Sequence, residues 1–259
     1  MTEPPRPPID VGRARPGVRQ GPHAREEGGV GAPPGPPKAV EISERLGLVR
    51  ERIAAAGADP TEVTVVAVTK GHGPEAAEAA LAAGIVDLGE NYAGELLRKH
   101  EVAGGRPPAP RWHFLGHVQR RKVRSIAGVV HLWQGVDREA AGAEIARRAP
   151  GAAVLVQVNV TGEAAKNGCR PDEAATLVDE LRGLDLRVLG LMAMGPAGPP
   201  EAARPGFRQL AALADELGLA ERSMGMSDDL EVAVQEGATM VRIGRALFGP
   251  RSTVPDLRR

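Results

Sequence analysis

Residues 63–70 read VTVVAVTK, a nearly unbroken run of apolar and β-branched side chains that ends in Lys70. The breakers Gly71-His72-Gly73-Pro74 follow, and then a helix-like stretch at 75–83. An apolar run of this length is typical of a strand buried on both faces. We therefore expect Lys70 where the strand leaves the core and enters a strand-to-helix loop. Partial burial there lowers the pKa of a lysine and favours a nucleophilic amine. The alternative is a lysine that simply extends into solvent.

The composition excludes several classes of protein. The 259 residues carry 33 basic and 33 acidic side chains, so no net charge attracts nucleic acid or membranes. Cys169 is the single cysteine, which excludes an intramolecular disulfide and fits a reducing compartment. No apolar signal or membrane-spanning segment is evident. We expect a cytoplasmic monomer that binds neither nucleic acid nor membrane.

The first 38 residues differ in composition from the rest. They contain ten prolines and seven glycines and have no apolar periodicity. Such a segment buries too little apolar surface to offset its ordering entropy. We predict a disordered Pro/Gly-rich tail at 1–38 and one folded domain at 39–259. A Pro-rich docking role for the tail stays open.

Strand-like and helix-like segments alternate along the folded part. The expected strands are 63–69, 85–89, 111–115, 130–135, 153–160, 187–193, 221–225 and 240–244. The expected helices after them lie near 75–83, 92–102, 118–127, 138–148, 171–183, 201–217 and 228–236. Strands separated by helices pair in parallel, and eight of them close a (β/α)8 barrel of the TIM type. The alternative, an open doubly wound sheet, needs a G-x-G-x-x-G turn that the sequence lacks.

Polar and unusual residues follow the ends of these strands, where such barrels place their binding sites. They are Lys70, Glu90 to Tyr92, Gly116-His117, Gln134-Gly135, Asn159 with Thr161, Met192 to Gly195, Met226 to Asp229, and Arg242 to Arg245. Their convergence on one face predicts a ligand site there.

The last two loops predict an anion site. Barrels often bind phosphate with the loops after strands seven and eight. Ser227 is placed to cap a helix, Gly244 lets the backbone approach an anion, and Arg245 can add a charge-assisted contact. An ordinary helix cap at Ser227 and a structural ion pair at Arg242 are equally compatible with the pattern. A reactive lysine opposite an anion site suits pyridoxal 5′-phosphate, which carries both an aldehyde and a phosphate.

Several motifs resemble those of the pyridoxal phosphate homeostasis protein family, single-domain relatives of the alanine racemase barrel. They are AVTKGHG at 67–73, GENYAGE at 89–95, WHFLGHVQRRK at 112–122, VNVTGEAAKNG at 158–168, GLMAM at 190–194 and SMGMSDDLEVAVQEGATMVRIGRALFG at 223–249. The resemblance covers about residues 40–250 and implies an alanine-racemase-like barrel with pyridoxal 5′-phosphate held covalently on Lys70 as a Schiff base.

The resemblance also implies roles for other residues. Ser223 and Ser227 match the family's phosphate-binding serines, and Arg242 matches an arginine near the pyridine nitrogen. Asn91 and Lys166 match the family's asparagine and second lysine. The full set expected to bind the cofactor is Lys70, Asn91, Met192, Ser223, Ser227, Arg242, Gly244 and Arg245, with no metal. An arginine on the pyridine nitrogen keeps it unprotonated, which weakens the cofactor as an electron sink and suits a carrier.

Three positions depart from the family pattern. Arg245 stands where threonine or serine often touches the phosphate, and Arg121 replaces an asparagine. His72 stands where a lysine is common. These departures leave Lys70 unchanged but put the details of phosphate contact and of cofactor transfer in question.

The chain is expected to carry the cofactor rather than to turn over a substrate. Racemisation needs acid and base groups on both faces of the substrate carbon. In the resembling racemases one of these is a tyrosine from a second domain, whereas the sole tyrosine here, Tyr92, lies within the barrel. We expect a regulator of vitamin B6 homeostasis that passes pyridoxal 5′-phosphate to apo-enzymes. The alternatives are a racemase-like enzyme and a Schiff-base aldolase.

Other candidate sites are weaker. His113 and His117 have the spacing of a zinc pair, but no H-E-x-x-H motif surrounds them. The basic run at 120–124 is expected to be a solvated helix face or part of the anion site. Cys169 is expected to be structural or exposed.

Overall fold

The computed structural model describes residues 38–105, 107–163 and 166–250. The chain divides into a unit of Met1–Pro33 and a unit of Pro34–Arg259, and the fold belongs to the second. The predicted disorder of the tail concerns residues that lie, apart from Lys38, outside the described ranges.

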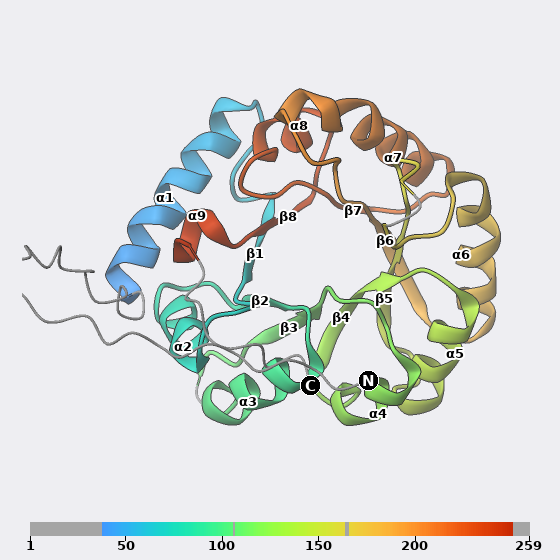
Figure 1. The fold of residues 1–259 in the computed structure, drawn as a ribbon, viewed down its shortest axis with the longest axis horizontal. Coiled ribbons are helices and arrows are strands. Elements are labelled where there is room, and N and C mark those ends of the chain that lie inside the picture. The colour runs from blue at the N-terminus through green and yellow to red at the C-terminus, as the bar shows by residue number, and fades with distance from the viewer. Residues whose placement is uncertain (1–37, 106, 164–165, 251–259) are drawn as a thin grey trace, which may run out of the picture. The chain divides into compact units, whose positions relative to one another are not determined.

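Eight parallel strands close into a barrel in the order in which they occur in the sequence. Helices surround the strands, as Figure 1 shows. The strands are β1 (Thr64–Val68), β2 (Asp87–Glu90), β3 (Arg111–Phe114), β4 (Val130–Val136), β5 (Ala153–Gln157), β6 (Arg187–Met192), β7 (Glu221–Ser223) and β8 (Met240–Ile243). Pairing of β1 with β8 closes the ring, with Val66 opposite Arg242. The predicted (β/α)8 barrel is confirmed.

Helices lie around the outside of the barrel, most of them between consecutive strands. They are α1 (Ala39–Ala55), α2 (Pro74–Ala82), α3 (Ala93–Ala103), α4 (Arg120–Ile126), α5 (Glu139–Arg148), α6 (Ala174–Gly183), α7 (Arg204–Glu216), α8 (Leu230–Gln235) and α9 (Arg245–Phe248), with short 3₁₀ turns at Pro171–Glu173 and Pro200–Ala203. The first helix, α1, precedes the barrel and contacts α2, α8 and α9. No helix in the described part of the chain is both long and apolar enough to cross a membrane.

Alternation along the strands separates two groups of buried side chains. In β8, Val241 and Ile243 belong to the large cluster between the strands and the helices. Met240 belongs to a small apolar cluster with residues of β1, β4, β5 and β6. Successive strand residues point to opposite faces, so Arg242 shares the inward face with Met240. The barrel interior is partly polar, since His113, Gln134 and Ser223 are also buried there.

The structure corrects the predicted helix start at Ser227. The helix begins at Leu230, and its N-cap residue is Asp229. The reason is local, because Asp229 Oδ1 accepts a hydrogen bond from the Met226 N–H at 2.6 Å and closes a turn that contains Ser227. Element boundaries also shift: β2 begins at Asp87 rather than at residue 85, and β5 ends at Gln157. The short helix α9 was not predicted.

Candidate functional site

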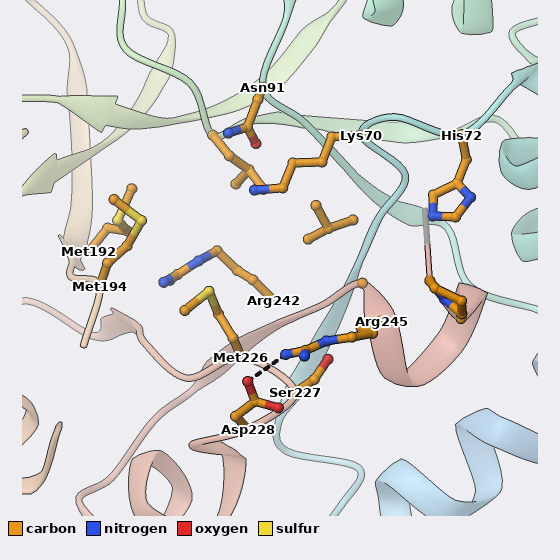
Figure 2. Close-up of a pocket in the computed structure, with 15 residues that line it drawn as sticks. Lys70, His72, Asn91, Met192, Met194, Met226, Ser227, Asp228, Arg242 and Arg245 are labelled. Carbon is orange, nitrogen blue, oxygen red and sulfur yellow. Dashed lines mark hydrogen bonds and ion pairs between the residues drawn. The ribbon is translucent and has the colours of Figure 1, made fainter. Parts of the chain in front are cut away.

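A cavity of about 220 Å³ lies at the carboxyl ends of the strands. Seven of the eight residues expected to bind a cofactor line it: Lys70, Asn91, Met192, Ser227, Arg242, Gly244 and Arg245. Figure 2 shows these side chains around one space, with Lys70 and Asn91 on one side and Ser227 and Arg245 on the other. Residues from five different strand ends are therefore brought together, as expected for a barrel site.

Lys70 extends into this cavity from the turn that follows β1. It is partly buried, and its amine points toward the middle of the pocket between Asn91 and Arg242 (Figure 2). His72, on the same turn, lies at the edge of the pocket, and its ring is 5.4 Å from that of Phe248. The turn therefore places one amine and one imidazole toward the ligand space.

A buried cluster of charged side chains anchors the turn that carries Lys70. Lys99 in α3 donates a hydrogen bond to the Thr69 carbonyl at 2.7 Å and forms an ion pair with Glu90. The Thr69 hydroxyl donates to Glu90 Oε1 at 2.6 Å, and the Gly71 N–H donates to Glu95 Oε2 at 2.9 Å. Burial raises the pKa of Glu90, and the charge of Lys99 opposes that shift. Both neighbours of Lys70 in the chain are thus anchored.

Sequence reasoning did not identify Lys99 as part of the site. A signal was present, because Lys99 occupies the buried face of α3 in line with Ala93, Leu96 and Ala103. A lysine at a core position of a helix needs a buried partner.

Asn91 supplies an unsatisfied acceptor to the pocket. Its Oδ1 atom is buried and has no hydrogen-bond partner within the described part of the chain. The loop that carries it approaches the next strand end very closely, since a Cβ atom on Gly116 would lie 2.0 Å from the Asn91 carbonyl oxygen. A buried acceptor without a partner is costly, and a ligand with a donor group would remove that cost.

Arg242 is fixed by neutral acceptors and keeps donors available. Its Nη1 donates to the carbonyl and hydroxyl oxygens of Ser223 at 2.7 and 2.8 Å, and Nη2 donates to the Ala193 carbonyl at 2.7 Å. A guanidinium has five N–H groups, so Nε–H and one Nη2–H have no acceptor among the described residues. Burial lowers the pKa of Arg242 to about 10, which leaves it charged at neutral pH.

A second group of polar atoms lines the cavity where β7 and β8 end. The Ser227 hydroxyl accepts a hydrogen bond from the Ala246 N–H at 3.2 Å, so its own proton remains available. Arg245 forms an ion pair with Asp228 at the pocket edge (Figure 2). Gly244 approaches β1, and a Cβ atom there would lie 3.3 Å from the Val68 carbonyl oxygen. Hydroxyl, guanidinium and backbone therefore converge at the end of β8.

Ser223 is the expected site residue that the structure does not bring to the pocket. Its hydroxyl is fully buried inside the barrel, where it accepts from Arg242 Nη1 and donates to Gln134 Oε1 at 2.7 Å. The reason is its partners, because both hydrogen bonds of this short side chain are made to buried residues of β4 and β8.

Eight lining residues were not in the predicted set, and three of them carry large or charged side chains at the ends of strands six and seven. These three are Met194, Met226 and Asp228, which follow β6 and β7. The sequence placed them at strand ends, but only the fold shows that they reach the cavity. Lys166 lies in a neighbouring cavity of about 350 Å³ and donates to Glu163 Oε1 at 2.7 Å and the Gly195 carbonyl at 3.1 Å.

The remaining sequence candidates lie elsewhere. Arg121 and Arg124 line a groove of about 750 Å³ along α4 and α5, apart from the pocket. Within the described ranges no group of three or more His, Cys, Asp or Glu side chains is arranged to hold a metal ion. His113 is buried in the barrel, whereas His117 pairs with Asp137 at 3.3 Å. Cys169 is buried, and burial raises its pKa to about 12.

Comparison with known proteins agrees with this fold. The family described as alanine racemase, N-terminal domain, matches residues 46–252, which defines the class of barrel. The pyridoxal phosphate homeostasis protein of Pseudomonas aeruginosa is 41% identical over 221 residues, covering 82% of this chain and 95% of the relative. That of Deinococcus radiodurans is 43% identical over 216 residues, covering 81% and 100%. The chain belongs to the pyridoxal phosphate homeostasis protein family.

Solved structures show the same fold. PipY of Synechococcus elongatus with pyridoxal phosphate bound is 31% identical, has a TM-score of 0.71, and covers 80% of this chain and 100% of its own. The form of PipY without the cofactor has a TM-score of 0.73 at 32% identity, with the same coverage. Alanine racemase from Bacillus anthracis, at 18% identity and a TM-score of 0.63, shares the fold.

Proposed function

We propose that this chain binds pyridoxal 5′-phosphate through a Schiff base on Lys70 and carries the cofactor without turnover. The observation that supports this most is the single cavity in which the Lys70 amine faces the anion site of Ser227 and Arg245. The names of the relatives and the cofactor bound to PipY support the same ligand.

The donor and acceptor set fits this cofactor. The unsatisfied Asn91 Oδ1 and the open N–H groups of Arg242 lie around the same space as Lys70. When bound, pyridoxal 5′-phosphate supplies an aldehyde that condenses with an amine with loss of water. Lys70 would supply that amine, and Ser227 and Arg245 would hold the phosphate. Arg242 would donate a hydrogen bond from a group that stays charged at neutral pH.

The pocket supports a carrier more than an enzyme. Tyr92, the sole tyrosine, is exposed and does not line the cavity. Asp228 lines it but is paired with Arg245. Arg242 is too weak an acid to transfer a proton to the pyridine nitrogen of the cofactor. An unprotonated pyridine ring withdraws electrons poorly, and amino-acid chemistry needs that electron withdrawal. Release of the cofactor to apo-enzymes is part of the proposal.

One observation favours the alternative, a racemase-like enzyme. His72 lines the pocket and is a residue type that transfers protons near neutral pH. Steady-state racemisation of alanine by the purified protein, abolished in Lys70→Ala and reduced in His72→Gln, would establish this alternative in place of the carrier.

The covalent link is tested by absorbance. Wild type mixed with pyridoxal 5′-phosphate should develop an absorbance band in the visible range, at a longer wavelength than the band of the free aldehyde, because the lysine imine is conjugated with the ring. Lys70→Ala should lack the band, and Lys122→Ala should retain it, since Lys122 lies on α4 away from the pocket. A band of equal intensity in Lys70→Ala would contradict the proposal.

A further inference from the structure

A chain of hydrogen bonds crosses the barrel interior from Asp87 to Arg242. We call it the barrel relay, and its members are Asp87, His113, Gln134, Ser223 and Arg242. Its links are Asp87 Oδ1 to His113 Nε2 at 2.9 Å, His113 Nδ1 to Gln134 Nε2 at 2.8 Å, Gln134 Oε1 to Ser223 Oγ at 2.7 Å, and Ser223 Oγ to Arg242 Nη1 at 2.8 Å. All five residues are buried.

The donors and acceptors of the relay fix its direction. Arg242 can only donate, so the Ser223 oxygen accepts from it and the single Ser223 proton is given to Gln134 Oε1. That contact turns the Gln134 amide so that Nε2 donates to His113 Nδ1. His113 then carries its proton on Nε2 and donates it to Asp87. Every link is satisfied in one arrangement, with His113 neutral.

The reversed arrangement is disfavoured. If the Gln134 amide were turned over, its oxygen would face His113 Nδ1, which would then need a proton. The Ser223 hydroxyl would lose its acceptor, and its proton would have no partner in the described interior. Buried polar groups without partners cost free energy, so the relay has a single stable orientation.

We propose that Gln134 and His113 are positioning residues for Arg242, which they hold through Ser223 so that its open N–H groups face the pocket. The inference rests on the proposed function, because the ligand that receives those N–H groups is the cofactor. Among the described residues no carboxylate pairs directly with Arg242, so its orientation depends on these neutral contacts.

The relay also connects the pocket to the opposite end of the barrel. Asp87 begins β2, and Arg111 at the start of β3 donates to Asp87 Oδ1 at 2.8 Å. Arg242 lies near the end of β8, at the pocket. The barrel relay therefore runs from the buried carboxylate of Asp87 to the buried guanidinium of Arg242. Its aligned hydrogen bonds stabilise both charges although the two groups are not in contact. Loss of a middle member would disturb the cation at the pocket.

The test compares substitutions of two buried barrel glutamines. Gln134→Met breaks the relay, whereas Gln157→Met alters a glutamine of β5 that donates instead to the Asn167 carbonyl at 3.1 Å. Cofactor affinity, measured by titration of full-length protein with pyridoxal 5′-phosphate, should fall roughly tenfold in Gln134→Met, as expected for weakening one hydrogen bond from a charged donor. It should stay within about twofold of wild type in Gln157→Met.

A conservative variant separates positioning from general damage. Gln134→Glu keeps an acceptor for Ser223 but offers a carboxylate oxygen to His113 Nδ1. Affinity should therefore stay within about threefold of wild type, while nitrogen NMR of the imidazole shows His113 doubly protonated at neutral pH. The His113 signals are assigned by their loss in His113→Gln.

Three outcomes are informative. Equal affinity of Gln134→Met and Gln157→Met would overturn the positioning role. Failure of wild type to bind the cofactor would overturn the proposed function instead. In that case the NMR spectrum of the cofactor-free protein still tests the relay, which requires neutral His113 protonated on Nε2. A proton on Nδ1 in wild type would overturn the relay itself.

Discussion

At the scale of single residues, buried charges determine how the Lys70 turn is held. Lys99 and Glu90 are almost completely inaccessible, with exposed side-chain fractions of 2% and 0%. The free energy of desolvating a buried ion pair cancels much of the attraction between its charges. Removal of one partner is nevertheless costly, because it leaves the other charge buried alone. We therefore expect substitution of either residue of the pair to lower the stability of the fold and to disturb the turn that carries Lys70.

Lys99→Met should lower the free energy of unfolding by about 3 to 5 kcal/mol, because Glu90 loses its cation. Urea denaturation measures the change, and Lys122→Met on the surface is the matched control. The double variant Lys99→Met/Glu90→Gln should regain part of the loss, since it removes the isolated charge. A loss in Lys99→Met no larger than that of the control would show that the pair does not stabilise the fold.

Residue identity alone could not locate every contact. Ser223 and Ser227 are both serines in one motif, yet only Ser227 lines the pocket. The difference is their place in the structure, because Ser223 ends a strand inside the barrel and Ser227 lies in the following turn. Lys70, at the end of the most apolar run, was the residue whose position the sequence predicted best.

At the scale of elements, ion pairs between strands act where the strands begin. Asp87 of β2 faces Arg111 and His113 of β3. Burial is the largest influence on Asp87 and raises its pKa, but the hydrogen bonds from His113 and Arg111 and the charge of Arg111 together outweigh it, so the pKa lies below its usual value. The lowered pKa means that ionised Asp87 stabilises the folded state.

Asp87→Asn should therefore destabilise the barrel by about 1.5 to 3 kcal/mol at pH 7. The effect has a defined pH dependence. The contribution of Asp87 is present above its unfolded pKa of about 3.9 and is lost as the pH falls through the lower folded value. Urea denaturation of wild type and variant should thus show a difference that shrinks below about pH 4.

The exposed pair of Asp172 with Arg170 provides the control for this measurement. Asp172→Asn should change the stability by less than about 1 kcal/mol. A difference between wild type and Asp87→Asn that stayed constant from pH 7 to pH 3 would contradict the stabilising role of the ionised carboxylate.

The elements themselves were well predicted because each strand is a short apolar run followed by a helical pattern. The errors concern boundaries. β2 is polar in part, and its pairing with β3 from Asp87 onward defines it better than its composition does. The start of α8 was misplaced because Ser227 resembles a cap, while the capping position belongs to Asp229.

At the scale of the whole molecule, the closed ring explains why distant segments form one site. Lys70 and Arg242 are far apart in sequence, but β1 and β8 are neighbours, and Val66 lies opposite Arg242. The sequence predicted the ring from the count and alternation of its segments. It could not predict the barrel relay, because that chain depends on which inward residues of β2, β3, β4, β7 and β8 meet across the interior.

The central claim is that Lys70 forms the covalent bond to pyridoxal 5′-phosphate, and chemical trapping tests it most directly. Full-length protein incubated with the cofactor is reduced with borohydride, digested and mapped by mass spectrometry. The account predicts a pyridoxyl adduct on the peptide that contains Lys70, because that amine lies in the pocket with Ser227, Arg242 and Arg245. An adduct found on Lys166 instead, with Lys70 unmodified, would contradict it.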